Sequence, residues 1–466
     1  MIPVRGFEGK RVAVFGLARS GLAAARALLA GGAQAEVWDD GVAARAAAAA
    51  EGLNLVDLSS ADLGDFAALV LSPGVPLTHP EPHWVVKKAH AAGVEVIGDV
   101  ELFARTVAAA PEHRRPKICA ITGTNGKSTT TALIGHICKG AGRNVQVGGN
   151  IGYGVLGLEE MHGGVVYVLE LSSYQLDLTS SLKPDAAVLL NITPDHLDRH
   201  GGMDGYVTAK KRIFRNQGAS DTAIIGVDDC YGQQICTEIT AANRRIIRPI
   251  SAGRAMSRGV YVLQGLLYDA GGESAVEVAD LHGARALLGR HNWQNAAAAY
   301  AAAMALGVSS QEAAEGLMSF AGLAHRMQEV ARKGQISFVN DSKATNADAA
   351  RQAMSAYSKF YWIAGGRAKA GGIESLRDLF PRIEKAYLIG ESADNFAKTL
   401  EGAAPYMVSR DLGRAVESAY ADASAEGRRA VILLSPACAS FDQFPDFEVR
   451  GDAFTAIARD LTGLSD

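Results

Sequence analysis

The stretch ICAITGTNGKSTTT, residues 118–131, most constrains the fold, because it combines an apolar strand, a small-residue turn and the start of a helix. The glycines of TGTNG allow unusual backbone angles, and the loop amides and helix start attract anions. A Walker loop reads G-x-x-x-x-G-K-[ST], but Ile121 stands where its first glycine belongs. The order strand, loop, GKST and helix predicts a nucleotide site. A glycine-rich turn followed by a surface lysine is the alternative.

The rest of the chain alternates short β-branched runs with longer Ala- and Leu-rich segments of helical pattern. Such alternation is typical of α/β layers on largely parallel sheets. Strands are predicted at residues 12–15, 69–72, 94–97, 118–122, 165–169, 188–191, 224–227, 337–340, 361–364, 386–389 and 431–434. The stretch AARAAAAAEG, residues 43–52, predicts an exposed Ala-rich helix.

The 466 residues suggest about three domains at roughly 150 residues each. Polar, proline-bearing residues 108–117 and the end of an Ala-rich region at residues 319–330 indicate the boundaries. We predict a Rossmann-like domain at residues 1–105, a P-loop ATPase-type parallel sheet domain at 106–323, and a second Rossmann-like domain at 324–466.

Composition argues against several classes of protein. The net charge of −4 gives no basic excess for nucleic acid. The five cysteines are scattered, and Cys230 and Cys236 have no matching pair for a zinc site. No apolar run approaches the roughly 18 residues of a membrane span, and the start of the chain does not resemble a signal peptide. We therefore expect a reduced, cytoplasmic protein that does not bind nucleic acid.

Residues 12–40 follow the outline of a dinucleotide-binding half: strand, turn, helix, strand and acidic residue. Gly16 and Gly21 match the first and third glycines of G-x-G-x-x-G, whereas Ala18 replaces the second. Asp39 follows the second strand, where an acid often meets a ribose. A NAD site, another nucleotide site and a simple tight turn all remain open. Residues 71–76, LSPGVP, form a second turn whose N–H groups could meet an anion.

Two further strand ends carry polar groups. Glu170 ends the strand in VVYVLELSSYQL, where a carboxylate can supply a metal ligand beside a phosphate loop; an acid facing solvent is the alternative. The next predicted strand lies in AVLLNITPDHLDRHGG and ends at Asn191. Asp195 and His196 follow it. Such a histidine is either a ligand or a structural residue. The lysines of the following YVTAKKRIF would ordinarily lie on a solvated helix face.

With these blocks in order, the chain resembles the Mur ligase family of peptidoglycan synthesis. GTNGKST, LELSSYQL, NITPDHLDRH, AKKRIF and GRHNWQNAAAA are similar to its central ATPase domain, much of which folylpolyglutamate synthases share. NDSKATN (340–346), GGRAKAGG (365–372) and SPACASFDQFPDFEVRG (435–451) resemble the D-glutamate-adding branch of the family.

The resemblance implies a reaction that joins the L-alanine carboxylate of UDP-N-acetylmuramoyl-L-alanine to the amine of D-glutamate, with ATP and two Mg²⁺ ions. Phosphoryl transfer to the carboxylate would form an acyl phosphate, which the amine then attacks. We expect a monomer. A folylpolyglutamate synthase-like amide ligase is the nearest rival, followed by a NAD-dependent oxidoreductase and a non-catalytic nucleotide switch. ADP release that requires D-glutamate would discriminate among them.

The resemblance also assigns roles to individual residues. The UDP-linked substrate would meet Ser20, Asp39, Asp40, Ser72, Gly74, Asn150 and Ser172. ATP would meet Gly123, Thr124, Asn125, Gly126, Lys127, Ser128, Thr129, Asn292, Asn295, Arg326 and Asp341. D-Glutamate would meet Lys369, Ser440 and Phe447. Mg²⁺ would be held by Ser128, Glu170, His196 and Lys210, and the catalytic groups would be Lys127, His196, Lys210 and Lys343.

Three of these assignments have simpler alternatives. Asn292 and Asn295 could only cap the helix that they open, and the SPACASFDQF block could be a strand-end loop with a buried Cys438. Lys210 resembles the family lysine that CO₂ converts to a carbamate. Lys211, about 100° further around the helix, is its rival.

Overall fold

The computed structural model describes residues 1–369 and 371–463, and it divides the chain into two units, Met1–Phe320 and Ala321–Asp466. The strands of the described residues form three sheets, of which each is parallel in its larger part. The predicted α/β class is therefore confirmed. Each predicted strand overlaps an observed one. The domain boundaries stay predictions, and residue 105 lies inside a helix.

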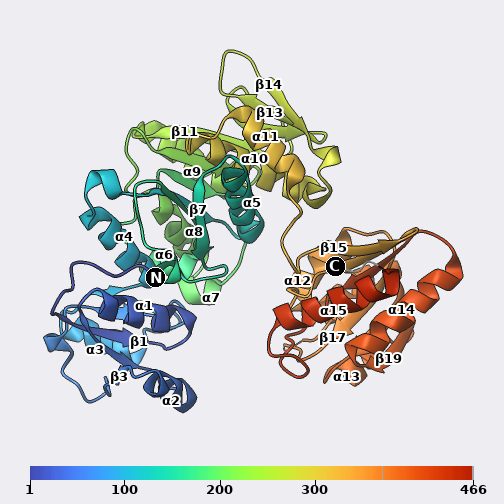
Figure 1. Ribbon diagram of the computed structural model, residues 1–466, viewed down its shortest axis with the longest axis horizontal. Helices are drawn as coiled ribbons and strands as arrows, with labels where there is room; N and C mark the ends of the chain where they lie inside the picture. The colour runs from blue at the N-terminus through green and yellow to red at the C-terminus, as the bar shows by residue number, and fades with distance from the viewer. Residues whose placement is uncertain (370, 464–466) are drawn as a thin grey trace. The chain divides into compact units, whose positions relative to one another are not determined.

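The first sheet lies near the N-terminus of the first unit and is drawn in blue (Figure 1). In the described chain its five strands are all parallel, in the order β3-β2-β1-β4-β5. They are β1 (Arg11–Phe15), β2 (Gln34–Trp38), β3 (Asn54–Leu55), β4 (Leu69–Leu71) and β5 (Val96–Ile97). The helices are α1 (Arg19–Ala30), α2 (Val42–Ala50), α3 (Trp84–Ala91) and α4 (Asp99–Ala109).

The central sheet of the same unit has the order β14-β13-β12-β11-β10-β9-β6-β8-β7 among the described residues. It is parallel from β7 to β12, and an antiparallel meander follows. Its strands are β6 (Lys117–Thr122), β7 (Asn144–Gly149), β8 (Val165–Glu170), β9 (Ala186–Leu189), β10 (Thr222–Gly226), β11 (Ile246–Ser251), β12 (Gly259–Leu263), β13 (Leu266–Ala270) and β14 (Val276–Asp280). Its helices are α5 (Lys127–Gly140), α6 (Ser173–Asp177), α7 (Leu197–His200), α8 (Met203–Lys211), α9 (Cys230–Ala242), α10 (Arg290–Ala305) and α11 (Ser310–Ser319).

The second unit holds the third sheet, in the order β15-β16-β20-β17-β18-β19 over the residues described. Only the β15–β16 pair of this order is antiparallel. The strands are β15 (Gln328–Lys333), β16 (Ile336–Asn340), β17 (Phe360–Gly365), β18 (Ile383–Ile389), β19 (Tyr406–Arg410) and β20 (Ala430–Leu434). The helices are α12 (Ala347–Ser355), α13 (Ala393–Leu400), α14 (Leu412–Glu426) and α15 (Phe447–Thr462).

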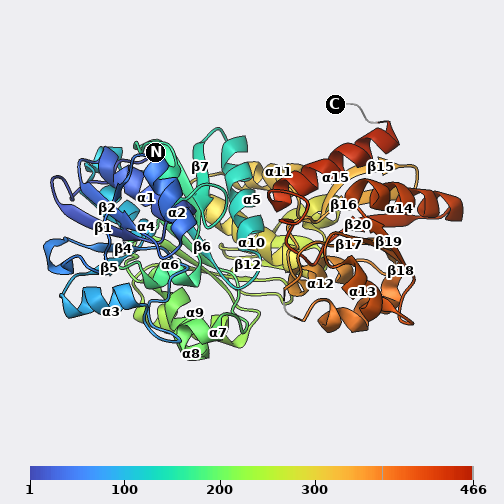
Figure 2. The same ribbon diagram turned by 90° about the horizontal axis from the view of Figure 1, so that it is seen from below.

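Two alanine-rich helices have opposite environments. In α2, Ala48 is the buried residue and most of the others are exposed or half-exposed, as predicted. In α10, by contrast, residues 296–303 are all buried. This helix packs beside α5 and against the central sheet (Figures 1 and 2). Small side chains allow that close approach, so α10 holds α5 and the loop before it in place.

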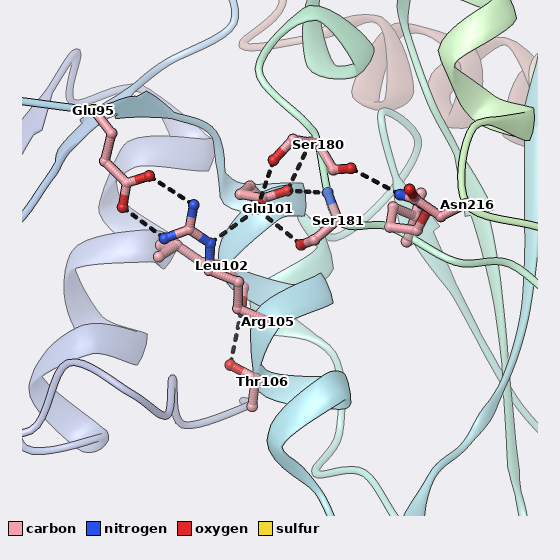
Figure 3. Close-up of polar contacts among 9 residues, drawn as sticks. Glu95, Glu101, Leu102, Arg105, Thr106, Ser180, Ser181 and Asn216 are labelled. Atoms are coloured by element: carbon pink, nitrogen blue, oxygen red, sulfur yellow. Dashed lines mark hydrogen bonds and ion pairs between the residues drawn. The ribbon is translucent and has the colours of Figure 1, made fainter.

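Helix α4 connects the first sheet to the central sheet through a buried carboxylate (Figure 3). Glu101, with 1% of its side chain exposed, accepts hydrogen bonds from the backbone nitrogens of Ser180 (2.8 Å) and Ser181 (2.9 Å). Arg105 Nε donates to it at 2.8 Å. Burial raises the pKa of Glu101, but the donors from Ser181 and Ser180 outweigh it and hold that pKa below its usual value. The ionised carboxylate thus joins α4 to the segment after α6.

Asp99 in the first turn of α4 gives a testable pH dependence. It is 3% exposed, and burial raises its pKa to about 6. Between about pH 4 and pH 6 the folded chain therefore binds more protons than the unfolded chain, so stability falls as the pH rises. Asp99→Asn should remove this dependence. The free energy of unfolding of the variant minus that of the wild type should therefore be larger at pH 7 than at pH 4, by on the order of 2 kcal/mol. Urea midpoints of both proteins at the two pH values test this; a constant difference would contradict it.

Candidate active site

The phosphate loop has the predicted setting, between β6 and α5 on the carboxyl edge of the central sheet. Gly126 begins the helix with φ +86°, a left-handed conformation that glycine adopts without strain. A Cβ at this position would lie 2.2 Å from Asn295 Oδ1. Gly126 is thus required both for its backbone angle and for the close approach of α10.

Lys127 and Ser128 begin α5 beside this loop. Lys127 Nζ donates to the carbonyls of Gly123 (2.9 Å) and Thr124 (2.8 Å), so the ammonium lies against the loop. Ser128 is 8% exposed. The first N–H groups of a helix have no partner within the helix, so the loop and helix start together suit an anion.

Glu170 provides an oxygen atom for a cation near the loop. It ends β8, and its Oε1 accepts a hydrogen bond from Asn150 Nδ2 at 2.9 Å. Its Oε2 is buried and has no hydrogen-bond partner among the described residues. An unpartnered carboxylate oxygen and a serine hydroxyl are ligands that Mg²⁺ takes together with phosphate and water oxygens. The residues present therefore fit the ion.

Lys210 is buried rather than solvated. Its relative exposure is 1%, and its Nζ donates to the Gly123 carbonyl at 2.9 Å. The ammonium lies 4.6 Å from the centre of the Tyr206 ring. Burial, followed by the positive charge of Lys127, lowers the pKa of Lys210 to about 7. A neutral amine is therefore available at this position near neutral pH.

Lys211 has different surroundings from its neighbour. Its side chain is 47% exposed and pairs with Glu238 on α9. The two lysines lie in one helix, and only their packing against the loop distinguishes them.

His196 projects from the segment after β9. Its φ is +52° and its side chain is 50% exposed, with Nε2 3.5 Å from Asp195 Oδ2. Burial lowers the pKa of its imidazole even though Asp195 raises it. His196 is thus a half-exposed, readily neutral nitrogen donor near the loop.

His200 has a structural role instead. It is 6% exposed, and its ring nitrogens contact Ser173 Oγ at 2.9 Å and Asp177 Oδ2 at 3.1 Å. Its ring stacks on that of Tyr174, 5.4 Å away. The resemblance assigned a metal-binding role to His196 and none to His200, and the role of His196 stays a prediction.

A cavity of about 350 Å³ lies where loops of the first sheet meet the ends of β7 and β8. It brings together six residues predicted to contact the UDP-linked substrate: Ser20, Asp39, Ser72, Gly74, Asn150 and Ser172. Asp40 is not among the residues that line it. The Asp40 carboxylate instead contacts Trp84 Nε1 at 3.3 Å and His83 Nε2 at 3.1 Å.

Asp39 shapes the cavity as well as lining it. Its two carboxylate oxygens accept hydrogen bonds from the backbone nitrogens of Leu17 and Gly41, each at 2.7 Å. Gly16 has φ +91°, and a Cβ on Gly21 would lie 1.8 Å from the Gly16 carbonyl oxygen. Gly16 and Gly21 are therefore needed for the tight turn between β1 and the start of α1.

The two asparagines of α10 lie behind the phosphate loop. Asn295 is 3% exposed; it accepts from Thr130 Oγ1 and donates to Asn292 Oδ1, both at 3.2 Å. The residue at the N-cap is Gly289, and no side-chain cap is present there. The helix-capping alternative for Asn292 and Asn295 is therefore wrong.

Two residues of the second unit are predicted to contact ATP: Arg326, which precedes β15, and Asp341, which follows β16. Asp341 is 5% exposed; its Oδ2 accepts from Ser435 Oγ at 2.8 Å and its Oδ1 from the Met327 nitrogen at 3.2 Å. Burial raises the pKa of Asp341 to about 7. Arg326 has a buried Nη1 without a hydrogen-bond partner among the described residues.

The other predicted residues of this unit lie near α15 and the end of β20. Lys343 Nζ lies 5.6 Å from the centre of the Phe447 ring, at the start of α15. Ser440 is 2% exposed, whereas Lys369 is exposed. Cys438 is a buried free thiol, as the strand-end-loop alternative for this block requires. Burial raises the pKa of the thiol to about 12.

Residues that the sequence did not assign also hold the phosphate loop. Tyr206 OH lies 3.1 Å from Thr124 Oγ1. Asn191, Gln294 and Asp228 form a hydrogen-bonded chain beside the loop. In the sequence, the positions of Asn191 and Asp228 at strand ends were a weak signal that these residues hold the loop. For Gln294 there was no such signal.

Across residues 1–369 and 371–463, no group of three or more His, Cys, Asp and Glu side chains could hold a metal ion. Mg²⁺ would therefore depend on hydroxyl, phosphate and water oxygens as well. Within the same residues, no helix has both the length and the apolar character needed to cross a bilayer.

Three segments of the chain match domains of one protein family. Residues 10–98 match the Mur ligase MurD-like N-terminal domain, 121–303 the Mur ligase middle domain, and 325–438 the Mur ligase glutamate ligase domain. The chain is 73% identical over 462 residues to the UDP-N-acetylmuramoylalanine--D-glutamate ligase of Caulobacter vibrioides, covering 99% of this chain and 98% of that protein. It is 53% identical to the enzyme of the same name from Rhizobium meliloti, with 100% and 99% covered. The crystal structure of UDP-N-acetylmuramate-alanine ligase from Thermotoga maritima has the same fold, with a TM-score of 0.56 and 18% identity over 97% of this chain and 100% of that chain.

Proposed function

This chain belongs to the Mur ligase family, and we propose that it adds D-glutamate to UDP-N-acetylmuramoyl-L-alanine with cleavage of ATP to ADP and phosphate. The similarity to the D-glutamate ligases over almost the whole chain carries this proposal. Mur ligases use ATP and Mg²⁺. The product is a precursor of peptidoglycan, and the reaction belongs in the cytoplasm. The folylpolyglutamate synthase-like alternative is not favoured.

We assign the loop from Gly123 to Thr129 to the triphosphate of ATP. Lys127 neutralises phosphate charge that would otherwise repel the substrate carboxylate. Glu170, Ser128 and His196 would hold two Mg²⁺ ions, which screen the same charge when bound. The L-alanine carboxylate takes up the γ-phosphoryl group and becomes an acyl phosphate; the D-glutamate amine then attacks the acyl carbon and phosphate leaves.

The cavity beside the first sheet is assigned to the UDP-linked substrate, through Ser20, Asp39 and Ser72. Asn150, hydrogen-bonded to Glu170 at 2.9 Å, would orient the substrate end nearest the reaction. Asp40 would act on the outer part of that site. Lys369, Ser440 and Phe447 would bind D-glutamate, and Arg326, Asp341 and Lys343 would act on ATP. We expect a monomer.

We propose that Lys210 reacts with CO₂ to give a carbamate. The amine is buried 2.9 Å from a loop carbonyl, beside the positions assigned to the cations. The carbamate reverses the charge of the side chain and presents two oxygens as metal ligands. An ammonium in the same place would repel the ions.

The assay that tests this function is ADP release with each substrate omitted in turn. We expect turnover with ATP, Mg²⁺, UDP-N-acetylmuramoyl-L-alanine and D-glutamate, and at least a hundredfold lower kcat/KM with L-glutamate. A site that pairs both carboxylates of one enantiomer leaves charge unpaired with the other. Equal turnover with the two enantiomers, or release of ADP that does not depend on D-glutamate, would refute the assignment.

A further inference from the structure

Four strand ends lie side by side along one edge of the central sheet. Strands β6, β9, β10 and β11 are neighbours in the sheet order and run parallel. Their carboxyl ends lead into the phosphate loop, Asn191, Asp228 and Ser251, respectively. Side chains at these neighbouring strand ends can therefore contact one another along this edge of the sheet, from the phosphate loop to Ser251.

Asn191 holds the loop directly. Its Oδ1 accepts from the Asn125 nitrogen at 2.9 Å, and its Nδ2 donates to the Asn125 carbonyl at 3.2 Å. Its own carbonyl accepts from the Thr124 nitrogen at 2.9 Å. Two loop N–H groups are thus engaged by the protein rather than offered to a ligand.

Gln294 continues the chain of contacts from α10. Its Oε1 accepts from Asn191 Nδ2 at 2.9 Å, and its Nε2 donates to Asp228 Oδ2 at 3.1 Å. Gln294 is 8% exposed. A Cβ on Gly226 would lie 1.8 Å from the Leu190 carbonyl oxygen and 3.3 Å from Gln294 Nε2, so only glycine leaves room for this arrangement.

Asp228 sets the donor-to-acceptor direction of this series of hydrogen bonds. Its Oδ1 accepts from Ser251 Oγ at 2.5 Å, and its Oδ2 accepts from the Ala252 nitrogen at 2.8 Å. Both oxygens of Asp228 thus act as acceptors, and the Gln294 amide turns its nitrogen toward Oδ2. Its oxygen then faces Asn191, whose own oxygen must face the Asn125 N–H.

We propose that Gln294 is a positioning residue for the triphosphate of ATP, acting through Asn191. By fixing the orientation of the Asn191 amide, it keeps the Asn125 peptide turned toward Asn191 and leaves the N–H groups at the start of α5 for the phosphates. The inference rests on the proposed function, because it requires ATP in this loop. It extends that function to residues far from the GKST sequence.

The test measures binding as well as turnover. Calorimetry with Mg²⁺ and the non-hydrolysable analogue AMPPNP is compared with binding of UDP-N-acetylmuramoyl-L-alanine. Gln294→Leu should weaken AMPPNP binding about tenfold, or about 1.4 kcal/mol, and leave the binding of the UDP-linked substrate unchanged. Gln311→Leu is the matched control, because Gln311 is an exposed helical glutamine whose Nε2 donates to Glu315 Oε1 at 2.9 Å.

Gln294→Glu separates orientation from space filling. Its ionised carboxylate would face Asp228 and repel it, so AMPPNP binding should weaken more than in Gln294→Leu. When protonated, the new side chain can donate to Asp228 and accept from Asn191, as the amide does. Its affinity relative to the wild type should therefore recover as the pH falls from 8 to 5.5, whereas that of Gln294→Leu should not.

The outcomes distinguish the two proposals. If the wild type binds no AMPPNP, the assignment of ATP to this loop fails. If the wild type binds it and Gln294→Leu binds equally well, the positioning role is wrong. Parallel loss of both ligands together with a lower melting temperature would make Gln294 a structural residue only and overturn the inference. The absence of any pH recovery in Gln294→Glu would do the same.

Discussion

Lys210→Ala is expected to lower kcat roughly a thousandfold, the scale seen when one charge-stabilising group is removed from an active site. The side chain is 1% exposed and lies 2.9 Å from the Gly123 carbonyl. Its removal takes away both the proposed carbamate and its contact with the phosphate loop. Steady-state ADP release at saturating substrates measures the effect, with the melting temperature recorded alongside.

Lys211→Ala is the matched control for this variant. Lys211 lies on the same helix, but its side chain is 47% exposed. It should keep most of the activity, because loss of an exposed ion pair costs about 0.2–1 kcal/mol of stability. The reverse pattern would mean that the wrong lysine was chosen. A carbamate resonance from ¹³C-bicarbonate should appear in the wild type and not in Lys210→Ala; its absence from the wild type would refute the carbamate.

Gly126→Ala is expected to lower kcat/KM for ATP on the order of a hundredfold, or about 2.7 kcal/mol. The φ of +86° is strained for alanine by roughly 1–2 kcal/mol. The added Cβ would also lie 2.2 Å from Asn295 Oδ1. Asn295 is buried and hydrogen-bonded on both sides, so either it or the loop must shift. Initial rates at varied ATP concentration measure the effect.

Gly142→Ala controls for the backbone strain alone. Gly142 follows the same helix at its other end, with φ +71°, and a Cβ there would meet nothing within 4 Å. It should reduce stability slightly and leave kcat/KM for ATP unchanged. Equal losses in both variants would show that strain, rather than the contact with Asn295, accounts for the effect.

Local features were read correctly from the sequence because their determinants are contiguous. The phosphate loop needs a strand, two glycines and GKST within residues 118–131, and all are found in that order. The exposed helix α2 followed from its alanines. Strands with weak patterns were missed, among them β7, β14 and β19. Strand β14 is mostly exposed and is held by pairing with β13, so burial left little pattern in its sequence.

Placement around the loop was decided by the tertiary structure. The helical pattern of α8 would ordinarily place both Lys210 and Lys211 in solvent, yet packing against the loop buries Lys210 and leaves Lys211 beside Glu238. Asn191 and Gln294 are 103 residues apart in the chain, and Gln294 and Asp228 are 66 apart. These contacts exist because parallel strands bring the carboxyl ends that carry Asn191 and Asp228 to one edge, and because α10 packs there with Gln294. The spacing of residues along a chain carries no record of that order.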